Sequence, residues 1–214
     1  MAIDFDATIT SVNPASDTLS FTTSGSNRYL FVQTLIQDSQ TCSGVTYAGV
    51  SMTSILGQID SSSVSGGGSI YLWGLANPAS GANDIVATFS GAGTRVIDAC
   101  SYTGAQQTTA LEASGSASGS GGTATKSITT LTDNDWLVGY VRSSGTTPSA
   151  GSNTTMRTAS AEGGRRMADS GAAQTPAGSF ALNYTGMTNW VVMVAALKPV
   201  VSTIYIPDLR LAFL

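Results

Sequence analysis

The stretch Val45–Gly81 decides the fold class. Residues 45–55 read VTYAGVSMTSI, and after a run rich in Ser and Gly, residues 70–81 read IYLWGLANPASG. β-Branched and aromatic residues dominate both apolar runs, Ala48-Gly49 interrupts the first, and Asn77-Pro78 ends the second. Short apolar runs separated by Gly, Asn and Pro are typical of β-strands joined by turns. The stretch therefore predicts an antiparallel β-sheet.

The composition of the whole chain favours the same class. Charged residues make up 10% of the 214 residues, against roughly 25% in an ordinary soluble domain. The chain has 24 Gly and is rich in Ser and Thr, and no window carries the apolar spacing of an amphipathic helix. These features predict an all-β protein with many turns. Low charge is also typical of surfaces that pack against other subunits.

Several function classes are excluded by what the chain lacks. It has no His, so Ser-His-Asp catalysis and His-ligated zinc are excluded. Its only lysines are Lys126 and Lys198, and binding of nucleic acid needs clustered cations. No apolar run reaches the ~18 residues of a membrane span, and the N-terminus lacks the pattern of a signal peptide. We expect a non-enzymatic protein with no catalytic, cofactor-binding or metal-binding residues, no nucleic-acid or membrane partner, and synthesis in the host cytoplasm.

Two local features have alternative interpretations. Cys42 and Cys100 each lie in or beside an expected strand, which favours two buried free thiols, although a disulfide between them stays open. Asp133 and Asp135 flank Asn134 in a polar segment. A calcium loop of the helix-loop-helix kind needs more oxygen ligands, a Gly and a closing Glu, which are missing. We therefore interpret that segment as a polar β-turn.

About twelve short strands can be placed along the chain, a number typical of a β-sandwich. Residues 28–36 are apolar on both faces and predict a central strand. Residues 90–93, Ser-Gly-Ala-Gly, predict a hairpin turn. Residues 113–122 read ASGSASGSGG, the composition of a flexible linker, so residues 105–125 are expected to form a long surface loop. No internal repeat is evident, and the pattern predicts an antiparallel, jelly-roll-like β-sandwich over residues 1–199.

The last fifteen residues, 200–214, read VVSTIYIPDLRLAFL and follow a finished set of strands. Pro207 excludes a central strand position and favours a sheet edge. We expect this C-terminal extension either to return to its own sheet or to add to the sheet of a neighbouring subunit. Its apolar residues form a candidate assembly arm: Ile204, Tyr205, Ile206, Leu209, Leu211 and Phe213.

Four large aromatic residues form a candidate core signature: Tyr47, Trp73, Trp136 and Trp190. The three Trp residues could instead line a sugar-binding platform. Because each lies in or at the start of an apolar strand, packing in the core or at an interface is the favoured interpretation.

The spacing of the opening stretch resembles that of uncharacterised β-sandwich domains in bacteriophage structural proteins and some bacterial surface proteins. The resemblance covers about residues 1–199, and the extension departs from it. The matching residues are Val45, Thr46, Tyr47, Gly49, Val50, Met52, Thr53, Leu72, Trp73, Leu75, Asn77, Pro78 and Gly81.

This resemblance implies a structural protein of a phage-like virion, such as a capsid decoration or an accessory protein of head or tail. Its expected partners are further copies of itself and other virion proteins. The alternative is a carbohydrate- or receptor-binding module of a fibre or surface protein, for which at least one exposed Trp is expected.

Overall fold

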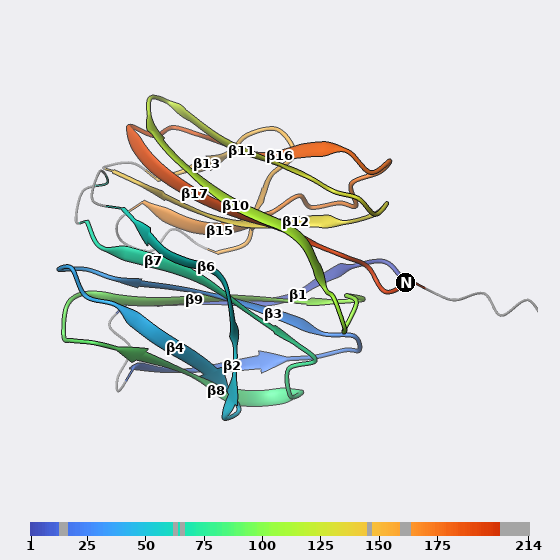
Figure 1. The fold of residues 1–214 in the computed structure, drawn as a ribbon, viewed down its shortest axis with the longest axis horizontal. Coiled ribbons are helices and arrows are strands. Elements are labelled where there is room, and N and C mark those ends of the chain that lie inside the picture. The colour runs from blue at the N-terminus through green and yellow to red at the C-terminus, as the bar shows by residue number, and fades with distance from the viewer. Residues whose placement is uncertain (13–16, 62–63, 65–66, 145–146, 159–163, 202–214) are drawn as a thin grey trace, which may run out of the picture.

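The structure is a computed structural model that describes residues 1–12, 17–61, 64, 67–144, 147–158 and 164–201. The described chain is all-β and folds into four stacked antiparallel sheets (Figure 1). We call residues 1–104 the first half and residues 105–201 the second half. Each half supplies one inner and one outer sheet, and the two inner sheets face each other.

The first half forms the two lower layers of Figure 1. Its inner sheet has the order β1-β9-β3-β7-β6 and its outer sheet the order β2-β8-β4-β5. The strands are β1 (Asp4–Val12), β2 (Thr18–Thr23), β3 (Tyr29–Ile36), β4 (Cys42–Tyr47), β5 (Val50–Ser51), β6 (Thr53–Asp60), β7 (Ser69–Ala76), β8 (Gly81–Phe89) and β9 (Arg95–Thr103).

The second half forms the two upper layers. Its inner sheet has the order β10-β17-β12-β15-β14 and its outer sheet the order β11-β16-β13. The strands are β10 (Leu111–Ser120), β11 (Thr123–Thr129), β12 (Trp136–Ser143), β13 (Ser149–Ala150), β14 (Thr155–Met156), β15 (Arg165–Asp169), β16 (Ser179–Thr185) and β17 (Asn189–Leu197).

Side chains alternate between the two faces of each central strand, and this alternation explains how the sheets stack. All eight residues of β3 are buried, which confirms that residues 28–36 contain a central strand. Leu30 and Val32 pack toward the outer sheet of the first half, whereas Phe31 and Leu35 pack toward the second half. Since successive side chains point to opposite faces of a strand, one strand can serve two cores.

The opening stretch folds as its pattern predicts in two places. Ala48 and Gly49 have positive φ angles, 50° and 76°, and form the two-residue turn between β4 and β5. Such a turn matches the right-handed twist of its flanking strands. Strand β7 ends at Ala76, directly before Asn77-Pro78.

The hairpin expected at residues 90–93 is wrong. These residues connect β8 in the outer sheet with β9 in the inner sheet, so they cross between facing layers. Residues 24–27 cross between β2 and β3 in the same way. A turn composition rich in Gly and Ser shows where the chain reverses and does not show whether the next strand pairs or crosses.

The surface loop expected over residues 105–125 is also wrong, because most of it forms β10 and the start of β11. Strand β10 is the edge strand of its sheet and pairs with β17. A Cβ on Gly119 would lie 2.7 Å from the indole of Trp190. The small residues therefore let a large neighbouring side chain pack against the backbone, as Gly in a strand commonly does.

The two halves have the same topology, although no repeat was expected from the sequence. When β5 is left out, the strands of each half correspond in chain order, so that β1 matches β10, β2 matches β11 and β9 matches β17. With this correspondence, the inner orders β1-β9-β3-β7-β6 and β10-β17-β12-β15-β14 are identical. The strand orders of the outer sheets, β2-β8-β4 and β11-β16-β13, also correspond.

One short stretch of sequence is similar in the two halves. Residues 21–29 read FTTSGSNRY and residues 128–136 read ITTLTDNDW, with Tyr29 and Trp136 as the first residues of β3 and β12. Thr23 and Thr130 are both buried, and their hydroxyls donate to the carbonyls of Ala79 and Gly178. Asn27 and Asn134 both have positive φ angles, 52° and 70°.

A bulge with a carboxylate recurs at the start of each half. The register of β1 shifts between Phe5 and Ala7, and that of β10 shifts between Leu111 and Ser114. At the first bulge, Asp6 accepts a hydrogen bond from the Ser24 backbone N–H at 2.9 Å. At the second, Glu112 accepts one from the Leu131 N–H at 2.6 Å. These N–H groups occupy equivalent places, each three residues after Phe21 or Ile128.

The halves bury the same face against each other. Equivalent pairs such as Phe31 and Val138, or Val96 and Val191, belong to one core cluster between the inner sheets. Beside it, the segments that follow β9 and β17 pair antiparallel at Ala105 and Pro199. Burial of one shared patch on both partners is the geometry of a two-fold dimer interface, here within one chain.

A substitution of Gly104 tests the contact between the segments that follow β9 and β17. Its φ is +72°, and a Cβ there would lie 1.9 Å from the carbonyl oxygen of Ala2. We predict that Gly104→Ala lowers the free energy of unfolding by ~2 kcal/mol or more. Gly57→Ala is the matched control, because a Cβ at that position of β6 meets no atom within 4 Å. Urea denaturation measures both variants, and equal midpoints would contradict the prediction.

Candidate functional site

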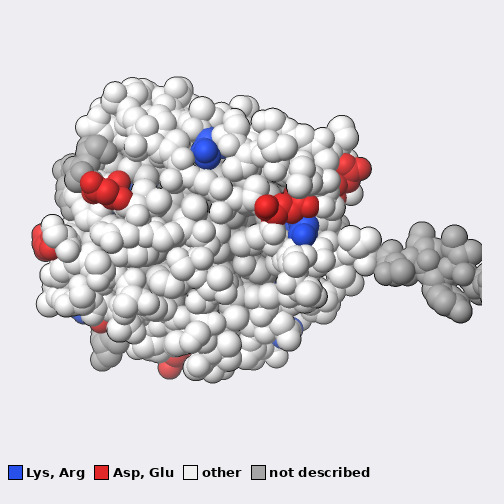
Figure 2. All heavy atoms as spheres, viewed as in Figure 1, with Lys and Arg blue, Asp and Glu red and all other residues white. Residues whose placement is uncertain are grey.

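Charged groups are sparse on the surface. Figure 2 shows a few acidic and basic groups on an otherwise uncharged face. Among the described residues, no group of three or more His, Cys, Asp or Glu side chains could hold a metal ion. No helix in that part of the chain is long and apolar enough to cross a membrane. Two clusters of polar groups lie between the two inner sheets.

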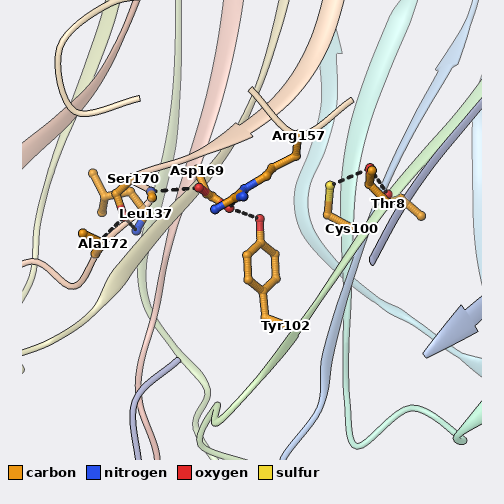
Figure 3. A network of polar contacts seen from close by, with 10 residues as sticks. Thr8, Cys100, Tyr102, Leu137, Arg157, Asp169, Ser170 and Ala172 are labelled. Atoms are coloured by element: carbon orange, nitrogen blue, oxygen red, sulfur yellow. Dashed lines mark hydrogen bonds and ion pairs between the residues drawn. The ribbon is translucent and has the colours of Figure 1, made fainter. Parts of the chain in front are cut away.

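One polar network joins the halves near the ends of β9 and β15 (Figure 3). The Tyr102 hydroxyl donates to Asp169 Oδ2 at 2.9 Å, and Arg157 Nε donates to the same oxygen at 2.6 Å. The other oxygen, Oδ1, accepts the Gly171 N–H at 2.8 Å. The guanidinium of Arg157 lies 4.3 Å from the centroid of the Phe5 ring. A carboxylate with this many donors is satisfied without solvent.

The network contains no activated nucleophile. Burial raises the pKa of Tyr102 well above its usual value, and burial raises the pKa of Cys100 to about 12. The Cys100 thiol instead lies 3.3 Å from the Thr8 hydroxyl. Reactive cysteines have a lowered pKa and partial exposure, so this geometry suits a structural link between the sheets.

We predict that Tyr102→Phe lowers the free energy of unfolding by ~1.5–3 kcal/mol, because it removes a hydrogen bond to a buried carboxylate. Tyr71→Phe on β7 is the control, since Tyr71 is similarly buried but lies in the core between the two sheets of the first half. Thermal unfolding measures both. An unchanged stability of Tyr102→Phe would show that the hydroxyl contributes nothing to joining the halves.

A second polar cluster lies farther along the same interface. Asp98 on β9 accepts a hydrogen bond from the Thr10 hydroxyl, and its other oxygen lies 3.7 Å from Arg165 Nε on β15. Gln33, beside Asp98 on β3, is fully buried, and neither polar atom of its amide has a partner in the described part of the chain. Burial raises the pKa of Asp98 to about 6, although Thr10 and Arg165 oppose that change.

The raised pKa gives a pH dependence with a definite sign. Between pH 4 and pH 6 the folded chain holds a proton on Asp98 that the unfolded chain has released. The associated stability is therefore present below about pH 4 and is lost as the pH rises through 6. Asp98→Asn should remove this loss, so wild type and variant should diverge by ~2–3 kcal/mol between pH 4 and pH 7.

Urea unfolding across this pH range measures the difference. Asp84→Asn, an exposed change on the outer face of β8, is the control and should leave the pH profile unchanged. Parallel profiles for wild type and Asp98→Asn would contradict the prediction.

The end of the molecule where the described chain stops is hollowed. A cavity of about 510 Å³ is lined by residues 1–3, 132–134, 173 and 199–201. The N-terminal ammonium of Met1 donates to the Val200 carbonyl at 3.3 Å, so both ends of the described chain meet here. Val201 is 67% exposed. The candidate arm residues Ile204, Tyr205, Ile206, Leu209, Leu211 and Phe213 lie outside the described residues.

The four signature aromatics are not brought together. Tyr47 is fully buried in the lower core, where its hydroxyl donates toward the carbonyls of Phe21 and Gly81. Trp73 packs in the same core, with its indole N–H donating to Thr34 Oγ1 at 3.0 Å. Trp136 lies between the inner sheets, and Trp190 packs at the upper core. They belong to three separate layers of side chains.

Both cysteines are buried and free, so the disulfide does not form. They lie in different cores, Cys42 between the sheets of the first half and Cys100 between the two inner sheets.

Sequence reasoning missed the buried charges at the interface. Asp98 stands inside the apolar run VIDAC, and a charge in such a run is a signal that the strand meets a polar partner. Arg157 and Asp169 carried no comparable signal, because their contact depends on how the second half packs against Tyr102.

The comparisons with known proteins found no match to a family model, a curated protein or a solved structure. The assignment of a role therefore depends on the fold and its surfaces.

Proposed function

We propose that the protein is a non-enzymatic structural subunit of a phage-like virion, which assembles through its sandwich surfaces and its C-terminal arm. The observation that carries the proposal is the exposed end of the described chain at Val201, together with the apolar sequence that follows it. The last strand of the described residues is β17, and beyond the exposed Val201 the sequence of residues 202–214 is largely apolar. An apolar sequence of this kind favours the addition of a strand to the sheet of another chain.

The strand order further supports the proposal, because it is similar to that of a fold found in viral proteins. We interpret β1-β9-β3-β7 facing β2-β8-β4-β5 as a jelly-roll order, and the second half repeats most of it. Jelly rolls occur in viral capsid domains and in lectin domains. Because one fold hosts many functions, this analogy raises the plausibility of a capsid role without assigning it.

The carbohydrate-binding alternative lacks the feature expected of it. Trp73 and Trp136 are only 6% and 7% exposed, and Trp190 is partly buried with its ring against Gly119. A stacking platform for sugar needs an open aromatic face. We therefore develop only the structural role.

Removing residues 202–214 tests the proposal. We predict that the full chain forms an oligomer and that the truncated chain is a folded monomer, because all the described strands end by Leu197. Analytical ultracentrifugation measures the mass, and circular dichroism checks the fold. The paired change Leu211→Asp with Phe213→Asp should act like the truncation.

Ser202→Ala is the matched control and should leave the mass unchanged. If the truncated chain assembles like the full chain, the proposed role of the arm is wrong.

A further inference from the structure

Strand β10 forms an open edge of the inner sheet of the second half. Its ten residues, Leu111–Ser120, pair with β17 on one side, and no other strand of the described chain pairs with them. From Ala113 to Ser120 the strand carries only Ala, Ser and Gly. Figure 1 shows β10 at the front of its sheet, and Figure 2 shows the same face with few charges. A long, uncharged edge strand offers unpaired backbone groups to another chain.

The other edge strands of the described sheets are less open to pairing. Strands β5, β13 and β14 have two residues each, and β6 shifts register twice against β7. Strands β2 and β11 border the outer sheets and are buried on one face only. Strand β1, the equivalent of β10 in the first half, begins with Asp4 and Asp6, and the guanidinium of Arg157 covers the ring of Phe5.

The cores on both faces of β10 are incompletely covered at this edge. Toward the outer sheet, Ala113 and Ala117 are only partly buried against the upper core. Toward the first half, Leu111 and two residues of the neighbouring β6, Ile55 and Ile59, are partly buried against the core between the inner sheets. A groove of about 300 Å³ lies where β10 begins and is lined in part by Leu111. A strand added to β10 would therefore bury apolar side chains on both of its faces.

The C-terminal arm has a sequence of this kind. Residues 204–206 read Ile-Tyr-Ile, so that a strand formed by them would be apolar on both faces. Leu209, Leu211 and Phe213 continue one of these faces. An edge strand of an outer sheet, with one face in water, would leave half of this pattern uncovered.

We propose that residues 204–213 of a second copy add as a strand to the open edge of β10. The inference rests on the role in assembly proposed above for the arm, and it names the surface that receives the arm. The added strand and β10 are equal in length. Pro207, which lacks an N–H group, is tolerated in the outermost strand of a sheet. Asp208 brings a charge opposite to that of Lys126, whose Cε would lie 2.7 Å from a Cβ on Gly115 of β10.

The length of the arm favours a second copy over the same chain. Leu197 pairs with Leu111, so the arm leaves the described chain beside the start of its own β10. At ~3.3 Å per residue, residues 202–214 are too few both to span β10 and to return along it antiparallel. The described ladders are all antiparallel, and an arm from a second copy can approach β10 in that direction.

Hydrogen exchange of the full-length chain tests the proposal. In the oligomer, the added strand should protect the β10 amides that do not bond to β17. The paired change Leu211→Asp with Phe213→Asp, the arm variant, should make these amides exchange at least ~10-fold faster, because the edge is open again. The amides of β1, the equivalent edge strand of the first half, are the internal control and should not change.

A change in the acceptor strand separates this inference from the proposed role of the arm. Ser114 and Ser118 are exposed on β10. The paired change Ser114→Lys with Ser118→Lys, the β10 variant, should reduce the sedimenting mass to that of the monomer, because Lys on an edge strand opposes pairing. Ser20→Lys with Thr22→Lys places the same two charges at exposed positions of the edge strand β2 and should leave the mass unchanged.

Loss of the oligomer in the β10 variant, together with faster exchange of β10 in the arm variant, supports the acceptor edge. If the arm variant loses the oligomer while the β10 variant keeps it, the arm binds elsewhere, and this inference alone is wrong. If removal of the arm leaves the mass unchanged, the proposed function is wrong as well. Protection of β10 by the arm in a chain that sediments as a monomer would show pairing within one copy and would contradict the inference.

Discussion

The structure depends on the burial of one apolar face of each inner sheet against its counterpart. Strands β3, β9, β12 and β17 are covered on both sides, so each contributes side chains to two cores. An inner sheet without its counterpart would expose Phe31, Val138 and their neighbours, a patch far larger than soluble surfaces usually present. The contact between the halves is therefore part of the folding core rather than an optional docking surface.

Polar groups set the geometry of this contact. Asp169 holds Tyr102 from the first half and Arg157 from the second, while Asp98 approaches Arg165 farther along the same interface. Hydrophobic contacts tolerate sliding, whereas hydrogen bonds to buried carboxylates fix position and direction. The repeat extends to polar groups, because equivalent bulges carry Asp6 and Glu112, and each carboxylate accepts a backbone N–H from the segment that precedes β3 or β12.

The sequence predicts the elements of the first half well, since β3 and β7 are largely apolar runs, with Asn27 shortly before β3 and Asn77-Pro78 directly after β7. It fails for β10, because its Ser and Gly composition resembles a linker and its strand form depends on pairing with β17 and on the Trp190 ring against Gly119. The repeat is not evident from the sequence, because the halves share only turn and packing positions, such as Thr23 with Thr130. The contact of Asp169 with Tyr102 could not be predicted, because it joins segments far apart in the chain.

Native-state hydrogen exchange tests the central claim, that the two halves form one folding core, most directly. The backbone amides of β3 and β9 in the first half and of β12 and β17 in the second should open with one shared, highest free energy, equal to that of global unfolding. The Tyr102→Phe substitution should lower the opening free energies of all four strands together. Exchange of one half at a distinctly lower free energy, while the other stays protected, would contradict the account and show two independent domains.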